Sequence, residues 1–113
     1  MSEIATLASR QLDAYNESDL DAFVGCYHPA VRVFEGEALV CEGTNAFRAR
    51  YARLFTDFEF GARVDERLDV GPHCVDLEHW WRIDPETGAR SEGAILVCYE
   101  AVEGRIGVVR FLR

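Results

Sequence analysis

Apolar side chains in the first half of the chain recur every three or four residues, which is the spacing of one helix face. Helical stripes of this kind cover residues 4–15, 20–27 and 47–55. We expect Ser18 to cap the second helix and Pro29 to end it, because serine accepts backbone hydrogen bonds at helix starts and proline cannot continue a helix. Between the second and third stripes, residues 31–35 alternate in polarity and predict a strand. Gly36 gives a turn, and residues 38–42 are expected to return as a second short strand.

From residue 58 the period falls from about 3.6 residues to about 2, which is typical of strands with one buried face. Long strands are expected at residues 58–70, 73–83, 92–102 and 105–112. Glu66 interrupts the apolar row of the first of these strands, and a β-bulge at this point would explain it without any function. Trp80 and Trp81 must face opposite sides of the second strand, and we expect Trp81 to share the inward row with His79.

Three helices followed by four long antiparallel strands predict a single α+β domain over residues 1–113. The architecture that buries every stripe is a cystatin-like cone, in which three N-terminal helices pack on a strongly bent, mostly antiparallel sheet that encloses a pocket. Residues 94–99 are apolar on both faces of their strand, so we expect Ile95, Val97 and Tyr99 on the convex face of the sheet. An apolar patch on that face predicts a homodimer.

The composition limits the chemistry that such a fold could carry out. All twelve basic residues are arginines, and twenty acidic residues give the chain a net charge of −8. Without lysine there is no Schiff-base amine and no phosphate-binding lysine of the Walker type. Acidic residues accompany every group of arginines, which argues against a nucleic-acid partner. The longest apolar run is far shorter than the ~20 residues of a membrane helix, so no membrane partner is expected.

Cofactor and metal motifs are missing from the sequence as well. The four cysteines lack C-x-x-C spacing, and we interpret them as reduced thiols of a cytoplasmic protein. His73, Cys74 and Asp76 are close in sequence, but strand alternation places His73 on the face opposite to the other two, which argues against a metal site. There is no glycine-rich phosphate loop and no G-x-S-x-G motif. The sequence therefore predicts neither a metal nor a cofactor.

Several segments resemble the nuclear transport factor 2-like superfamily. Residues 14–23 (AYNESDLDAF), followed by Tyr27-His28-Pro29 and Val31-Arg32-Val33, resemble its opening, most closely in the ketosteroid isomerase and SnoaL-like polyketide cyclase branches. Residues 42–47 (EGTNAF) resemble the junction to its third helix, and residues 104–110 (GRIGVVR) resemble its last strand. The resemblance covers nearly the whole chain and implies the cone fold with a pocket. This scaffold hosts isomerases, cyclases, dehydratases, epoxide hydrolases and binding modules, so it does not by itself define an activity.

The resemblance to ketosteroid isomerase suggests specific site residues. The general-base aspartate of that family falls on Glu35, at the end of a strand, where an apolar pocket would raise its pKa. The tyrosine of the family's oxyanion hole falls on Gln11, which can still donate a hydrogen bond, and its protonated acid falls on Leu96, which cannot. The loss of that donor argues against an authentic ketosteroid isomerase. The alternative for Glu35 is a solvated glutamate beside a turn.

His79 is the second catalytic candidate, as a pocket acid, base or donor, and its alternative is a satisfied core histidine. The expected lining of the pocket comprises Gln11, Tyr15, Tyr27, Phe55, Glu66, Trp81 and Leu96. Two functions remain. One is a cofactor-free enzyme that uses a carboxylate base on a small, largely apolar carbonyl, hydroxyl or epoxide compound. The other is a non-catalytic ligand-binding or dimerisation module on the same fold.

Overall fold

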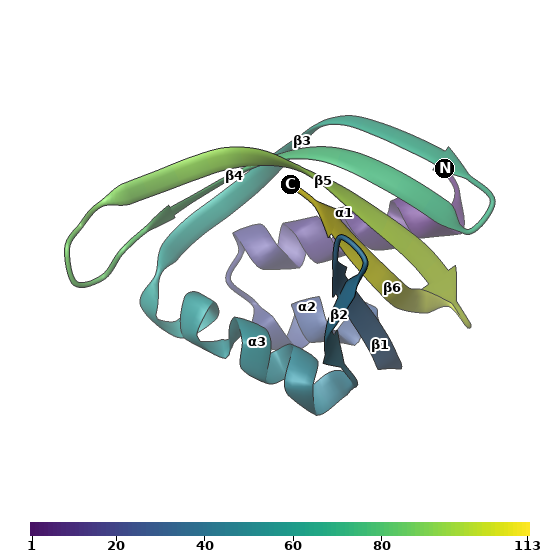
Figure 1. Ribbon diagram of the computed structural model, residues 1–113, viewed down its shortest axis with the longest axis horizontal. Coiled ribbons are helices and arrows are strands. Elements are labelled where there is room, and N and C mark those ends of the chain that lie inside the picture. Colours follow the sequence, from purple (N-terminus) through teal and green to yellow (C-terminus); the bar gives the residue numbers. More distant parts are fainter.

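A bent six-stranded sheet covers three helices in the computed structural model, which describes all of residues 1–113 (Figure 1). The elements in chain order are α1 (Glu3–Asn16), α2 (Leu20–Gly25), β1 (Tyr27–Glu35), β2 (Ala38–Glu42), α3 (Thr44–Asp57), β3 (Glu59–Val70), β4 (His73–Ile83), β5 (Arg90–Val102) and β6 (Arg105–Leu112). The strand order is β2-β1-β6-β5-β4-β3, and β1 and β6 are the one parallel pair. The sheet is open, and its concave face packs on the helices. The predicted α+β cone is confirmed.

The helix ends follow ordinary capping chemistry, with two differences from the prediction. Asp19, rather than Ser18, caps α2, since its carboxylate accepts a hydrogen bond from the Ala22 amide at 3.1 Å. Ser18 instead adopts a left-handed conformation, with a φ of 57°. The helix ends at Gly25, and Pro29 lies inside β1, where a missing amide donor is tolerated at a strand position that is not paired through that group.

A β-bulge in β3 decides which side chains face the helices. The pairing of β3 with β4 shifts between Val64 and Glu66, so Asp65 is an extra residue, as the sequence predicted for this strand. Beyond the bulge the two rows of β3 exchange faces. Leu68 and Val70 are therefore 76% and 80% exposed instead of continuing the buried row. The side chain of Arg67, just after the bulge, turns toward the helices.

The inward faces of β4 and β5 are the reverse of the prediction. The row of β4 that faces the helices begins with Cys74 and Asp76, which are both 1% exposed, and continues through Glu78 and Trp80. Within the apolar run 94–99 of β5, every second residue is buried. These buried residues are Ile95, Val97 and Tyr99. The prediction that these three residues lie on the convex face is therefore wrong, because they form part of the core.

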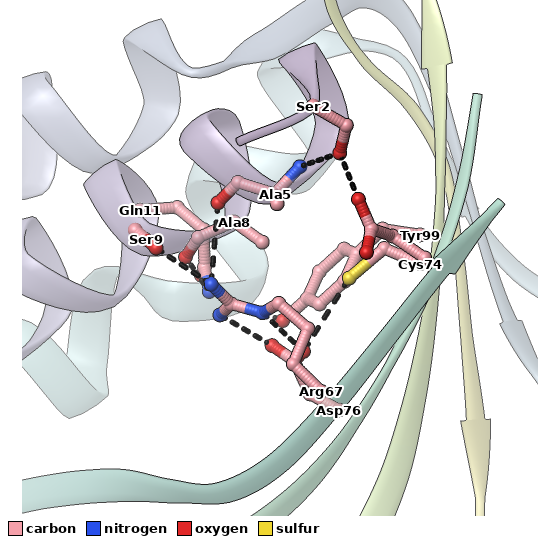
Figure 2. Close-up of polar contacts among 10 residues, drawn as sticks. Ser2, Ala5, Ala8, Ser9, Gln11, Arg67, Cys74, Asp76 and Tyr99 are labelled. Carbon is pink, nitrogen blue, oxygen red and sulfur yellow. Dashed lines mark hydrogen bonds and ion pairs between the residues drawn. The ribbon is translucent and has the colours of Figure 1, made fainter. Parts of the chain in front are cut away.

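An ion pair explains how a carboxylate can lie on the buried row of β4. The bulge brings Arg67 opposite Asp76, and the two form a bidentate pair with nitrogen–oxygen distances of 2.6 and 2.9 Å (Figure 2). The same guanidinium donates to the Ser9 hydroxyl at 2.6 Å and to the Ala5 carbonyl at 3.2 Å on α1. The pair therefore neutralises a buried charge and ties α1 to the sheet.

Each tryptophan packs on a glycine of the neighbouring strand. Trp81 lies over Gly61 of β3, where an added Cβ would come within 2.9 Å of the indole nitrogen. Trp80 lies over Gly93 of β5, where an added Cβ would come within 3.0 Å of the ring. The two side chains occupy opposite faces, as predicted, but the inward one is Trp80 and not Trp81.

Candidate functional site

A cavity of about 340 Å³ lies between the helices and the concave face of the sheet. Ten of its fifteen lining residues are hydrophobic, and tyrosines from α1, β1, α3 and β5 provide all of its hydroxyl groups. Its lining residues are Gln11, Tyr15, Phe23, Tyr27, Arg50, Tyr51, Leu54, Glu78, Trp80, Arg82, Ile95, Tyr99, Val109, Phe111 and Arg113. The size and the apolar walls are those of a small-molecule site, and a few polar groups are placed inside it.

Glu78 is the single carboxylate that lines this cavity. Strand β4 places its side chain on the inward row, four residues before Arg82 and two before Trp80. Burial raises the pKa of Glu78 to about 7, and the negative charge of Asp76 acts in the same direction. None of the hydrogen bonds within the protein involves the Glu78 carboxyl. It is therefore a half-buried acid with a pKa near neutral, and it is free to exchange a proton with a ligand.

Three buried side chains that line the cavity form a short series of hydrogen bonds. The Tyr27 hydroxyl donates to the Gln11 side-chain oxygen at 2.9 Å, and the Gln11 side-chain nitrogen donates to the Tyr99 hydroxyl at 3.1 Å. Figure 2 shows Gln11 reaching from α1 toward Tyr99 on the sheet. The Tyr99 hydroxyl accepts the hydrogen bond from Gln11, and no group in the protein accepts a hydrogen bond from it. The Tyr99 hydroxyl proton is therefore available to a ligand.

The tyrosines of the cavity remain protonated across the physiological range. Burial raises the pKa of Tyr51 to about 12, and it raises the pKa of Tyr15, Tyr27 and Tyr99 above the ordinary value as well. After burial, the Glu78 charge is the strongest electrostatic influence on both Tyr15 and Tyr99. Hydroxyl donors therefore lie within electrostatic reach of the one titrating carboxyl in the cavity.

The predicted base, Glu35, lies outside the lining of the cavity and in an ion-pair cluster. Its carboxylate accepts two hydrogen bonds from Arg113, both at 3.1 Å, and one from Arg50 at 3.3 Å. The hydrogen bonds from Arg113 lower the pKa of Glu35, and the charges of Arg113 and Arg50 lower it further. The expectation of a raised pKa at this position is therefore wrong, because two arginines stabilise the charged form.

The structure places the other predicted site residues in two groups. Gln11, Tyr15 and Tyr27 line the cavity. Phe55 is buried behind them, with its ring 5.6 Å from that of Tyr15, and it contributes to the core rather than to the cavity surface.

Four predicted residues, Glu66, His79, Trp81 and Leu96, do not reach the cavity. Trp81 and His79 belong to the outward row of β4, where the His79 imidazole contacts the Asp65 carboxylate of the bulge. Leu96 is 41% exposed on the outward row of β5. The expectation for His79, Trp81 and Leu96 was wrong because apolar patterning alone assigns the wrong faces of β4 and β5 to the inside of the cone.

Sequence reasoning missed Glu78, Tyr99 and Arg82 as site residues, and a signal for Glu78 and Arg82 was present. The bulge that Glu66 indicated also turns Arg67 toward the helices, where a buried arginine requires a carboxylate partner. Asp76 is the acid that pairs opposite Arg67 in the register of the two strands. With Asp76 assigned to the inward row, alternation would have placed Glu78, Trp80 and Arg82 on the same face.

Metal binding has no structural support, since no three His, Cys, Asp or Glu side chains lie close enough to hold a metal ion. All four cysteines are free thiols, and burial raises the pKa of Cys74 to about 12. None of the helices is both long and apolar enough to span a bilayer.

The fold and the cavity together define a pocket-bearing α+β cone of the cystatin-like class. Residues 8–109 match the SnoaL-like domain family, and the chain belongs to this family, within the nuclear transport factor 2-like superfamily. The predicted resemblance is confirmed. No curated protein matches the sequence significantly.

Solved structures confirm the fold. An uncharacterised cystatin-fold protein from Novosphingobium aromaticivorans is 22% identical, with a TM-score of 0.87 over 100% of this chain and 99% of that one. A Δ5-3-ketosteroid isomerase from a Mycobacterium species is 13% identical, with a TM-score of 0.90 over 100% and 94%. An M. tuberculosis epoxide hydrolase of the LEH-like type is 15% identical, with a TM-score of 0.82 over 96% and 80%.

Proposed function

We propose that this protein is a cofactor-free enzyme that transfers a proton on a small, largely apolar carbonyl compound, with Glu78 as the catalytic base. The observation that carries the proposal is a carboxyl in an aromatic cavity, with no hydrogen-bonding partner and a pKa of about 7. A general base is most effective when its pKa lies near the working pH, because it is then both partly ionised and sufficiently basic.

The proton transfer uses one carboxylate and one hydroxyl donor. Glu78 removes a proton from the carbon next to the substrate carbonyl, and the electron pair of that bond moves to the oxygen to form an enolate. The Tyr99 hydroxyl donates a hydrogen bond to this oxygen and stabilises the charge that develops there. Glu78 then returns the proton, at a different carbon in an isomerisation. The ketosteroid isomerase among the structural neighbours supports this type of reaction on the scaffold.

This proposal moves the role of base from Glu35 to Glu78. Glu35 is held in its charged form by Arg113 and Arg50, which makes it a weak base, and the second candidate, His79, faces away from the cavity. Glu35 orders the two arginines at the rim of the cavity. A catalytic role for Glu35 remains a prediction, and the comparison of Glu78→Gln with Glu35→Gln tests it.

The test is the exchange of hydrogen for deuterium at the carbon next to the carbonyl of small cyclic ketones, followed by NMR. This exchange reports enolate formation and does not require knowledge of the natural substrate. Removal of a general base typically costs 10²–10⁴-fold in rate. Glu78→Gln should lose roughly 100-fold or more of the protein-catalysed exchange, while Glu35→Gln should stay within about tenfold of the wild type. Equal loss in both variants, or loss in Glu35→Gln alone, would contradict the assignment.

The alternative is a ligand-binding module without catalysis. It is favoured by the hydrogen bonds that join Tyr27, Gln11 and Tyr99, because these groups partly satisfy one another instead of facing a reacting atom. A binding module would hold cyclic ketones without accelerating exchange in any variant.

We also propose a homodimer through the convex face of the sheet, with residues that differ from those first expected. Large apolar side chains are exposed on the outward rows of β3, β5 and β6, namely Leu68, Val70, Leu96 and Leu112. Exposed apolar surface of this kind favours association with a second copy. Sedimentation at micromolar concentration should give the mass of a dimer, and a monomer would contradict the proposal. A cytoplasmic location, predicted from the cysteine pattern, remains a prediction.

A further inference from the structure

Arg82 is the one arginine that is neither exposed nor partnered. Eight of the other arginines form ion pairs or donate to a backbone carbonyl, and the three without partners, Arg10, Arg32 and Arg105, are exposed. The guanidinium of Arg82 has no such partner, and its Nε atom is buried and unsatisfied. Leaving a charged donor unpaired in a buried place costs free energy, so such a group indicates a missing anion.

The cavity is locally positive in a protein that is strongly negative. Arg50, Arg82 and Arg113 line it, against Glu78 as the only acidic lining residue. Glu35 is shared between Arg50 and Arg113 at the rim, so its single negative charge compensates one of their two positive charges. Arg82 is the lining arginine that no carboxylate pairs, and the cavity keeps an excess of positive charge although the chain as a whole has a net charge of −8. A concave site with this excess of positive charge attracts anions.

The position of Arg82 is fixed by packing. Its guanidinium lies 5.1 Å from the centre of the Trp80 ring, and Trp80 is itself seated on Gly93. A planar guanidinium held in this way is preorganised to bind a planar carboxylate through two parallel hydrogen bonds.

We propose that the cavity binds small aromatic or alicyclic carboxylates, with the acid group on Arg82 and the ring among the tyrosines. Arg82 and Glu78 share one face of β4 and are four residues apart, which corresponds to roughly 13 Å along the strand. A ring compound anchored by its acid group at Arg82 therefore extends toward Glu78. Together with the proposed function, on which this part rests, the substrate class becomes a cyclic compound that carries both a carbonyl and a carboxylate.

The test compares naphthoate with its uncharged amide, naphthamide, by titration calorimetry. The two probes share a ring system and differ in the charge of one group. The wild type should bind naphthoate at least about tenfold more tightly, since a charge-assisted pair with a buried arginine is stronger than a neutral hydrogen bond. Arg82→Met should remove this preference and leave naphthamide binding unchanged. The matched control is Arg90→Met, because Arg90 lies 4.9 Å over Trp81 on the opposite face of the sheet and should not affect either probe.

Two further variants keep the test decisive. Arg82→Gln removes the charge but keeps a planar polar group over Trp80, so it should also lose the preference if Arg82→Met does not fold. Glu78→Gln should keep or increase the preference for naphthoate, which separates this inference from the role of Glu78 in catalysis. Equal affinity for the two probes in the wild type would overturn the proposal. A preference that persists in both Arg82 variants, or no binding of naphthoate in the millimolar range, would overturn it as well.

Discussion

Replacing Glu78 with glutamine should stabilise the protein at high pH and leave its stability unchanged at low pH. Burial raises the pKa of Glu78 from 4.5 to about 7, so the folded state holds the proton over a pH range in which the unfolded state has released it. Stability therefore falls as pH rises from about 4.5 to about 7, because the folded state must then ionise a buried acid. At about 1.4 kcal/mol for each pKa unit, the full penalty at pH 8 is at most about 3.5 kcal/mol. Glutamine has nearly the same shape and does not ionise, so it avoids this penalty.

The assay is denaturant unfolding of the wild type and Glu78→Gln at pH 4 and pH 8, under reducing conditions. The gain in unfolding free energy should be near zero at pH 4 and about 2–3 kcal/mol at pH 8, with no change in the denaturant slope. Glu37→Gln is the matched control, since Glu37 is an exposed glutamate in the β1–β2 turn and should show no such pH dependence. A gain that is the same at both pH values, or equal to that of Glu37→Gln, would refute the assignment of Glu78 as a buried, unpaired acid.

Three further predictions concern the frame that holds the site. Arg67→Met leaves the buried Asp76 carboxylate without its partner and should lower the free energy of unfolding in urea by about 3–5 kcal/mol. A loss below about 1 kcal/mol would mean that the pair is not buried. Gly61→Ala places a Cβ against the Trp81 ring and should cost about 1–3 kcal/mol of unfolding free energy in thermal or denaturant unfolding. Gly25→Ala is the control and should not show this steric loss, because no neighbouring atom lies within 4 Å of the added Cβ. Leu96→Arg should convert the proposed dimer into a monomer in sedimentation while naphthamide binding stays unchanged. A dimer that persists in this variant would place the interface elsewhere.

The helices and strands could be predicted from the sequence because their periodic patterns extend over many residues. The stripe from Ile4 to Tyr15 corresponds to α1, and the alternation from residue 58 corresponds to the long strands. Even the bulge at Glu66 is visible, since a single charged residue interrupts an otherwise regular apolar row. These features depend on neighbours in the sequence, which is why pattern analysis finds them.

The inward face of β4 could not be identified from polarity alone. Its outward row contains Val75, Leu77 and Trp81, and its inward row contains two carboxylates. The inward row nevertheless faces the helices, because Arg67 from another strand neutralises Asp76, and because Glu78 faces a cavity. Both conditions depend on contacts between strands, and the pattern within one strand does not contain them.

The position of Glu35 shows the same limit for the site. A match in sequence position correctly finds a carboxylate at the end of β1, but its pKa depends on Arg50 from α3 and on Arg113 at the far end of the chain. Side chains that lie far apart in the sequence thus convert a candidate base into a stable anion. The carboxyl that remains unpaired belongs to Glu78 on β4, and the resemblance to ketosteroid isomerase suggests no site residue on this strand.

The pH dependence of protein-catalysed deuterium exchange in a cyclic ketone tests the role of Glu78 most directly. With Glu78 as the base, the exchange rate of the wild type should rise with pH to a plateau with a midpoint near 7, and this pH-dependent rise should be absent in Glu78→Gln. A midpoint in the ordinary range of an exposed glutamate, or an unchanged profile in Glu78→Gln, would contradict the account.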